Sequence, residues 1–361
     1  MPFARKIMTV MPHDQSNYEL PEGLHLDGKT LVIHNEVKAS GGRWWVRILL
    51  FVFGFSMLLN LMLMATVGNL VTETSDFSEK LVEGDLLTTD KIALIEVSGT
   101  IMPPMTERIL KVIEHAEEDD NVKAALLVVD SPGGVVADSH QIYHALTELQ
   151  KAKPVYVQMK RLAASGGYYI SMGIGPKGKI FAEPTTWTGS IGVILPQYDA
   201  SELAEKVGVK SNSLTTGPLK DALNPLNPAT DLEIETWQAI IDEAFDLFVE
   251  VIDSGRENLN PEQIREIATG QVYTAKQALS NGLIDEISFQ EQTLQTLKSD
   301  FQLGEVKVVR YEFPVTFNDL FLGVTAPKQQ SIQQILSPGI PQAMYLFSRE
   351  GFPALPIPSA Y

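Results

Sequence analysis

The sequence predicts an α/β fold preceded by one transmembrane helix. A stretch of 25 residues without a charge, Ile48 to Thr72, is long enough to cross a bilayer. After it, short apolar runs alternate with helix-like segments, the pattern of a parallel sheet with helices on its faces. The 361 residues are 44% hydrophobic, yet no other uncharged stretch is as long, so the remainder has the composition of a globular protein.

The first 47 residues are expected to form a cytoplasmic tail. Residues 1–42 show no sustained period of 2 or 3.6 and are expected to be poorly ordered. Arg43 and Arg47 precede the uncharged stretch, whereas acidic residues follow it: Glu73, Asp76, Glu79, Glu83 and Asp85. The positive-inside rule therefore places residues 1–47 in the cytoplasm and the chain beyond residue 72 on the outer side of the cell membrane.

Residues 48–72 are expected to be an uncleaved anchor in contact with membrane lipid. A cleavable signal peptide has a short leader and an apolar region of about 7–15 residues. Here the leader exceeds forty residues and the apolar region is longer. A buried core helix is the other alternative, and 25 uncharged residues are unusual for one.

The rest of the chain divides into a linker at residues 73–89, a globular domain at residues 90–311 and a Pro-rich extension at residues 312–361. Strands are expected at Lys91–Val97, Val122–Asp130, Pro154–Met159 and Leu283–Ile287. Helices are expected at Met105–Glu117, Val135–Ala152, Asp231–Ser254, Pro261–Ile267 and Ala275–Ser280. The extension holds seven of the 21 prolines and is expected to be extended, either packed over the domain, at an oligomer interface, or loose.

Composition excludes several classes of function. The net charge of -17 argues against nucleic acid as a partner, because phosphate binding needs an excess of Lys and Arg. The absence of cysteine excludes disulfides, thiolate nucleophiles and cysteine metal sites. His140 and His144 share a helix face, but no third metal ligand follows at motif spacing. We therefore expect neither a metal nor another cofactor.

Two glycine turns could carry chemistry. Asp130-Ser-Pro-Gly-Gly134 ends one apolar strand and opens a helix, so its free amides could hold an oxyanion, unless it is an ordinary strand-to-helix turn. Ala163-Ala-Ser-Gly-Gly-Tyr-Tyr169 follows another strand and presents Ser165 on a tight turn. Ser165 is either a nucleophile or a plain helix N-cap.

A serine nucleophile needs a base. His13, His25 and His34 lie in the tail, and His115 lies in an acidic helix end. A Ser-His-Asp triad that uses His140 or His144 remains an alternative. The other common activator is a lysine kept neutral by burial, and Lys220, in an otherwise nearly uncharged loop, is the best candidate. A solvated surface lysine is the alternative for that residue.

Five motifs occur in the order and approximate spacing found in one known family: Asp130-Ser-Pro-Gly-Gly134, Lys153-Pro-Val-Tyr-Val157, Ala163-Ala-Ser-Gly-Gly-Tyr-Tyr-Ile170, Thr188-Gly-Ser-Ile-Gly-Val193 and Gly217-Pro-Leu-Lys-Asp221. Residues 91–300 thus resemble the short form of the signal peptide peptidase A family, Ser/Lys proteases related in fold to the Clp protease and crotonase group. The segment 171–179 looks a few residues longer than the family pattern.

The resemblance implies a spiral of β-β-α units and a residue-by-residue assignment. Ser165 would be the nucleophile, Lys220 the general base and Ser190 the residue that orients the lysine. The amides of Gly134 and Gly166 would form the oxyanion hole, with Gly133 shaping the turn. Short-form relatives form homo-oligomeric rings, for which an octamer is one candidate, and a neighbouring subunit supplies the lysine. The spacing of Ser165 and Lys220 permits a pair within or between subunits.

The function implied is a membrane-anchored serine endopeptidase that degrades cleaved signal peptides and other hydrophobic peptides at the outer face of the membrane. Residues 90–311 would be the Ser/Lys protease domain. The substrate class follows from the resemblance and from the anchor. Two alternatives remain: a crotonase-like acyl-CoA enzyme, and a catalytically silent membrane scaffold.

Overall fold

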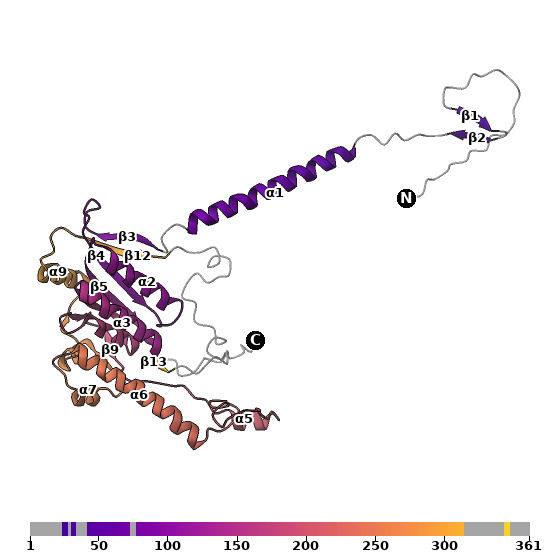
Figure 1. Cartoon of the computed structure of the whole chain (residues 1–361). Coiled ribbons are helices and arrows are strands. Elements are labelled where there is room, and N and C mark those ends of the chain that lie inside the picture. Colours follow the sequence, from indigo (N-terminus) through magenta and orange to yellow (C-terminus); the bar gives the residue numbers. More distant parts are fainter. Residues whose placement is uncertain (1–23, 28–29, 34–41, 73–76, 314–342, 347–361) are drawn as a thin grey trace, which may run out of the picture. The chain divides into compact units, whose positions relative to one another are not determined.

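The computed structural model describes residues 24–27, 30–33, 42–72, 77–313 and 343–346 (Figure 1). The chain divides into two compact units, residues 1–74 and residues 75–361. The elements of the first unit come directly from local sequence patterns, whereas those of the second depend on a shared core.

The first unit contains a short hairpin and one long helix. Strands β1 (Leu24–Asp27) and β2 (Thr30–Ile33) pair antiparallel, so the expectation of a poorly ordered tail is wrong for these residues. The sequence signal was Gly28 between two short runs rich in Leu, Val and Ile. Helix α1 (Gly42–Thr72) includes a stretch, Trp44–Met64, that is long and apolar enough to cross a membrane.

The second unit is built on a nine-stranded, mostly parallel sheet, which confirms the α/β class. Its main path runs β10-β9-β7-β5-β4-β12-β3, with β8 beside β7 and β11 beside β8. The strands are β3 (Ser78–Glu83), β4 (Lys91–Ser98), β5 (Val122–Ser131), β7 (Val155–Ala164), β8 (Ile180–Ala182), β9 (Trp187–Gly189), β10 (Val272–Thr274), β11 (Glu286–Ile287) and β12 (Lys307–Glu312).

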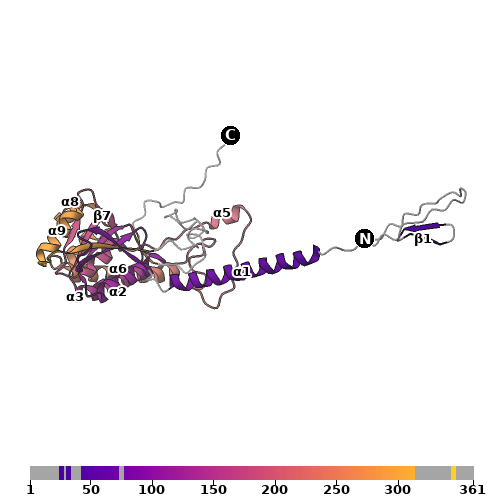
Figure 2. The ribbon, with the colours of Figure 1, turned by 90° about the horizontal axis from the view of Figure 1, so that it is seen from above.

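Helices cover both faces of this sheet. They are α2 (Met105–Glu118), α3 (Val136–Ala152), α4 (Gly166–Ser171), α5 (Ser201–Lys206), α6 (Asp231–Gly255), α7 (Pro261–Ile267), α8 (Ala275–Ser280) and α9 (Gln290–Asp300), with a 3-10 turn at Met172–Ile174. Helices α2, α3, α4 and α6 contribute to the larger apolar core, and α9 contributes to a smaller core on the other face (Figure 2).

Strand β5 shows why the central strands read as continuous apolar runs. Ala125, Leu127 and Val129 belong to the larger core, whereas Leu126 and Val128 belong to the smaller one. Successive side chains point to opposite faces of a strand, so a strand covered on both faces has no polar face. This burial accounts for the confirmed predictions of β4 and β5.

The structure adds elements that the sequence reading did not assign. Strand β3 lies within the segment read as a linker and pairs antiparallel with β12, which itself pairs parallel with β4. Helix α9 was missed because it contains only two apolar residues, Leu294 and Leu297, too few for a visible helical period. β3, β12 and α9 are short and mostly polar. Their positions are therefore set by the sheet against which they pair or pack, and that sheet is built from other residues.

Strand β7 positions the candidate site. It extends five residues beyond the predicted end at Met159. Its first half pairs with β8, and its last three residues, Leu162–Ala164, pair with β9. The residue that follows β7 is therefore held against the end of β9.

Candidate active site

Ser165 occupies the turn between β7 and α4. Its backbone has φ 54° and ψ -114°, a region that non-glycine residues seldom adopt and that is typical of functional turns. Its amide donates a hydrogen bond to the Gly189 carbonyl at 2.7 Å, and its carbonyl accepts one from the Tyr169 amide at 2.8 Å. The residue is 1% exposed, and Oγ has no hydrogen-bond partner among the described residues. The turn thus holds a buried, unpartnered hydroxyl.

Three glycines converge beside this serine. Gly133 and Gly134 lie in a short strand, β6 (Gly133–Val135), and Gly133 has φ 97°. A Cβ on Gly133 would lie 2.6 Å from the amide nitrogen of Gly166, and a Cβ on Gly166 would lie 3.1 Å from the amide nitrogen of Gly134. No side chain fits between these backbones, so the two amides border one small space. Amides placed in this way can stabilise a developing oxyanion.

Ser190 follows Gly189, the last residue of β9, whose carbonyl accepts the hydrogen bond from the Ser165 amide. Its φ is 51°, its side chain is 6% exposed, and its amide donates to the Gln271 carbonyl at 2.7 Å. The paired ends of β7 and β9 therefore bring together Ser165 and Ser190, which are 25 positions apart in the chain.

Lys220 lies elsewhere in the same chain. It is exposed in the loop between α5 and α6, and its amine forms no hydrogen bond or ion pair with any described residue. Figure 1 shows this loop and α5 projecting away from the sheet. A single chain therefore does not place the proposed base against Ser165.

The histidine alternative is not supported by the contacts of His140. Its Nδ1 lies 2.7 Å from the Tyr169 hydroxyl, at hydrogen-bond distance, and it forms no hydrogen bond with Ser165. Burial, and then the neighbouring His144, lower the pKa of His140. The neutral imidazole thus holds a tyrosine of α4 rather than the serine.

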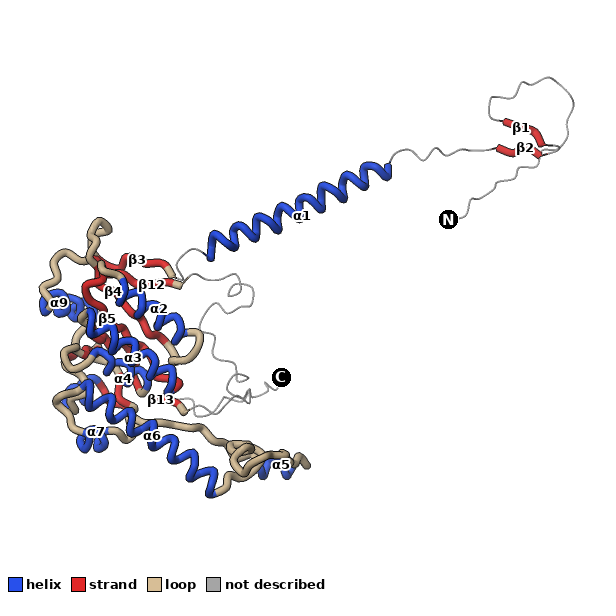
Figure 3. Tube along the Cα trace, viewed as in Figure 1, coloured by secondary structure: helices blue, strands red, loops and turns tan. Residues whose placement is uncertain are grey.

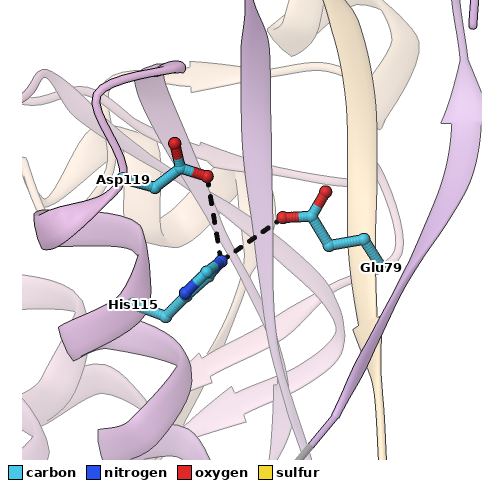
Figure 4. Close-up of side chains that lie close together, drawn as sticks. All are labelled: Glu79, His115 and Asp119. Atoms are coloured by element: carbon cyan, nitrogen blue, oxygen red, sulfur yellow. Dashed lines mark hydrogen bonds and ion pairs between the residues drawn. The ribbon is translucent and has the colours of Figure 1, made fainter. Parts of the chain in front are cut away.

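One cluster of histidine and carboxylate side chains lies on other elements. Glu79, His115 and Asp119 offer ligand atoms within 4.8 Å of one another (Figure 4). The side chain of Lys91 is only 8% exposed, and its ammonium forms ion pairs with both carboxylates, at 2.6 Å from Asp119. Because this cation already neutralises the carboxylates, we interpret the cluster as an ion-pair network that joins β3, β4 and α2.

The sequence reading missed an aromatic pocket next to the serine. Tyr169 packs against Phe248 of α6 and Tyr345, with ring centroids 5.0 and 4.8 Å away. The double tyrosine after Gly167 was a visible signal for one wall of the pocket. No local pattern in the Pro-rich extension marked Tyr345.

Two family models and several of the related proteins point to one class of enzyme. The model of peptidase family S49 matches residues 147–304, and the Clp protease model matches residues 82–191. "Putative signal peptide peptidase SppA" of Enterococcus faecium is 35% identical over 257 residues, which are 71% of this chain and 73% of that protein. "Protease 4" of Haemophilus influenzae is 37% identical over 216 residues, 56% of this chain and 34% of that protein. "Serine protease SPPA, chloroplastic" of Arabidopsis thaliana is 33% identical over 213 residues, 55% and 30% of the two chains.

Proposed function

The chain belongs to peptidase family S49 and is a serine protease, and from this premise we propose that it is a membrane-anchored endopeptidase with a Ser165–Lys220 dyad. The observation that carries the proposal is the buried, unpartnered hydroxyl of Ser165 on a strained turn beside the amides of Gly134 and Gly166. A nucleophile in such a place needs only a base and a substrate carbonyl.

The proposed mechanism is acyl transfer. The neutral amine of Lys220 accepts the proton of Ser165, and the alkoxide attacks a peptide carbonyl carbon. The Gly134 and Gly166 amides stabilise the oxyanion, and Gly133 leaves room for it. The lysine then gives its proton to the leaving amine, and water hydrolyses the acyl-enzyme. Ser190 orients the amine.

We propose that Lys220 comes from a neighbouring copy of this chain. The segment that carries it, residues 201–240, exposes large apolar side chains: Leu203, Val207, Val209, Leu214, Leu219, Leu226, Leu232, Ile234 and Ile240. An exposed apolar surface of this extent is typical of an interface. A homo-oligomeric ring would cover this surface and exclude water from the lysine, which favours its neutral form.

The membrane anchor suggests the substrates. Only residues 73–77 separate α1 from β3, so the protease unit is tethered near the bilayer. Arg43 and Arg47 before the span, and acidic residues after it, favour an outer-face location for this unit. We therefore propose cleaved signal peptides and other hydrophobic membrane peptides as substrates.

A fluorophosphonate probe tests the dyad. The full chain should be labelled at Ser165, and Ser165→Ala should not be labelled. Lys220→Ala should label about 10²–10⁴ times more slowly, because a general base typically contributes this factor. Lys210→Ala is the matched control, since Lys210 is another exposed lysine of the same segment. Absence of label from Ser165, or equal rates for the two lysine variants, would remove the dyad and favour a silent scaffold or another chemistry.

A further inference from the structure

A second buried serine lies beside the candidate active site. Ser139 is the fourth residue of α3, and α3 packs against both α4 and β6, the elements that carry the glycine amides (Figure 3). Ser139 is completely buried, yet its hydroxyl oxygen has no hydrogen-bond partner among the described residues. Buried hydroxyl groups are nearly always paired, so this exception needs an explanation.

Ser139 borders the space between the two amides proposed as oxyanion donors. A Cβ on Gly166 would lie 2.6 Å from the Oγ of Ser139 and 3.1 Å from the amide nitrogen of Gly134. The amide nitrogen of Gly166 is itself bonded to the carbon that would carry this Cβ. The hydroxyl and both amides are therefore neighbours around one position, which is open because residue 166 has no side chain.

A neighbouring buried serine, Ser131, shows the contrast between a structural hydroxyl and that of Ser139. The Oγ of Ser131 accepts a hydrogen bond from the Gly133 amide at 3.0 Å, and the Gly133 carbonyl accepts one from the Ile101 amide at 2.8 Å. Ser131 thus holds the glycine turn in place. Ser139 makes no such bond, and its hydroxyl proton has no acceptor among the described residues. An unpaired donor beside two oxyanion-hole amides fits an acceptor that the substrate brings.

We propose that the Ser139 hydroxyl is a third donor of the oxyanion hole, beside the amides of Gly134 and Gly166. This inference deepens the proposed function and rests on it. When the Oγ of Ser165 bonds to the substrate carbonyl carbon, the π electron pair of the carbonyl moves to its oxygen, and the Ser165 proton passes to the general base. Ser139 donates a hydrogen bond to that oxygen and keeps its own proton. The bond strengthens as negative charge develops, so it stabilises the transition state more than the bound substrate.

Steady-state kinetics on Ser139→Ala tests the proposal, with the full chain in detergent and a fluorogenic trileucine coumarinamide as substrate. One oxyanion donor typically contributes about 10²–10³ to kcat, so kcat should fall at least about 10-fold when one of three is lost. KM should change less than about 3-fold, because the bond matters little in the bound substrate.

The matched control is Thr106→Val. Thr106 also carries a buried hydroxyl without a partner among the described residues, and it too lies near the start of a helix, α2. Its kcat should stay within about 2-fold of that of the parent, because a buried hydroxyl without a catalytic role contributes nothing to the transition state. An equal loss of kcat in both variants would overturn the role given to Ser139.

Urea titration distinguishes this role from a structural one. A hydroxyl without a partner contributes no hydrogen bond to the folded state, so Ser139→Ala should leave the urea midpoint unchanged or raise it. Ser131→Ala leaves the buried Gly133 amide unpaired and should lower the midpoint. A midpoint that falls together with kcat in Ser139→Ala would show that Ser139 supports the fold, and would overturn the proposal.

A peptide aldehyde tests the contact with the oxyanion. Trileucine aldehyde forms an adduct with Ser165 whose oxygen enters the hole, whereas trileucine alcohol binds the groove without forming this bond. In Ser139→Ala, the Ki of the aldehyde should rise by the factor by which kcat falls, and the Ki of the alcohol should stay unchanged. An unchanged Ki of the aldehyde, or an equal rise for both compounds, would exclude Ser139 as a donor to the oxyanion.

The outcomes separate this inference from the proposed function. Equal labelling rates for Lys220→Ala and Lys210→Ala would remove Lys220 as the base but leave the Ser139 results intact, because the oxyanion forms whichever group takes the proton. An active parent with an equally active Ser139→Ala would overturn the third donor and leave the dyad in place. Absence of fluorophosphonate label from Ser165 would overturn both.

Discussion

Ser165 combines a strained backbone with an unpartnered side chain. A non-glycine residue in this region of φ and ψ costs about 1–3 kcal/mol and persists only where the surroundings hold it. Here the Gly189 carbonyl and the first turn of α4 hold the residue. A plain N-cap serine would accept a hydrogen bond from an amide of its helix, and Ser165 accepts none. The capping alternative therefore does not explain this residue.

Gly133 is the residue whose substitution should separate activity from stability. In Gly133→Ala, the new Cβ would lie 2.6 Å from the amide nitrogen of Gly166, one of the two amides proposed as oxyanion donors. We expect kcat/KM for a peptide substrate to fall at least about 10²-fold, the range seen when an oxyanion hole is damaged. Steady-state kinetics on purified protein measures this.

The control for this prediction is Gly99→Ala. Gly99 has a nearly identical φ of 99°, but a Cβ there meets no atom within 4 Å. The two variants share the backbone penalty of a positive φ, so a similar kcat/KM for both would show that strain, not the blocked space, causes the loss.

At the scale of elements, the ion-pair network around Lys91 joins two strands of the sheet, β3 and β4, to helix α2. Lys91 begins β4, Glu79 lies in β3, and Asp119 follows α2. Lys153 donates hydrogen bonds to two carbonyls at the end of α2, at 2.7 and 2.6 Å. Strand β3 is the first element after α1, so this network fixes the point where the protease unit begins.

The network should make the free energy of unfolding depend on pH in acidic solution. Burial opposes ionisation of Asp119, but the hydrogen bonds from Lys91 and the Asn121 amide, together with the nearby charges of Lys91 and His115, outweigh it and lower the pKa of Asp119. The stabilisation by the Asp119 carboxylate is therefore fully present above about pH 3.9, the pKa of an aspartate in the unfolded chain. It is lost as the pH falls through the lower pKa of Asp119 in the folded protein. Asp119→Asn should lower the free energy of unfolding by about 1–2 kcal/mol at pH 7, and the difference should shrink below about pH 4.

Urea titrations of the full chain in detergent at several pH values check this. Asp120→Asn is the matched control, since the neighbouring Asp120 is exposed and its carboxylate forms no bond with a described residue. A difference between wild type and Asp119→Asn that stays constant from pH 7 to pH 3 would contradict the role given to this carboxylate.

At the scale of the whole molecule, the proposed active site is incomplete in one chain. Ser165, Ser190 and the glycine amides lie together at the ends of β5, β7 and β9, whereas Lys220 is exposed on a segment with an apolar surface. A ring built from head-to-tail contacts places one patch of each subunit against a different patch of the next. Such contacts would bring Lys220 of one subunit to Ser165 of another.

Mixing two inactive variants tests this arrangement. Ser165→Ala and Lys220→Ala chains, combined in equal amounts and reassembled, should recover about one quarter of wild-type activity, because each site needs a serine from one chain and a lysine from the next. Replacing the Lys220→Ala chain by a chain that carries both substitutions should give no activity. Activity that stays at background, despite mixed particles seen by mass photometry, would place the pair within one chain; the particle mass also tests the octamer.

The sequence by itself determined the elements that local periodicity and composition specify: the uncharged helix, the central apolar strands, the long helices and the two glycine turns. These depend on the spacing of apolar residues and on backbone freedom, which are properties of neighbours in the chain. Tertiary structure alone decided that β3 and β12 extend the sheet, that Ser190 lies beside Ser165, and that Tyr345 enters the aromatic pocket. Each of these joins residues far apart in sequence, and such pairing is specified by complementary backbone edges and buried surface, which leave no periodic mark on either segment.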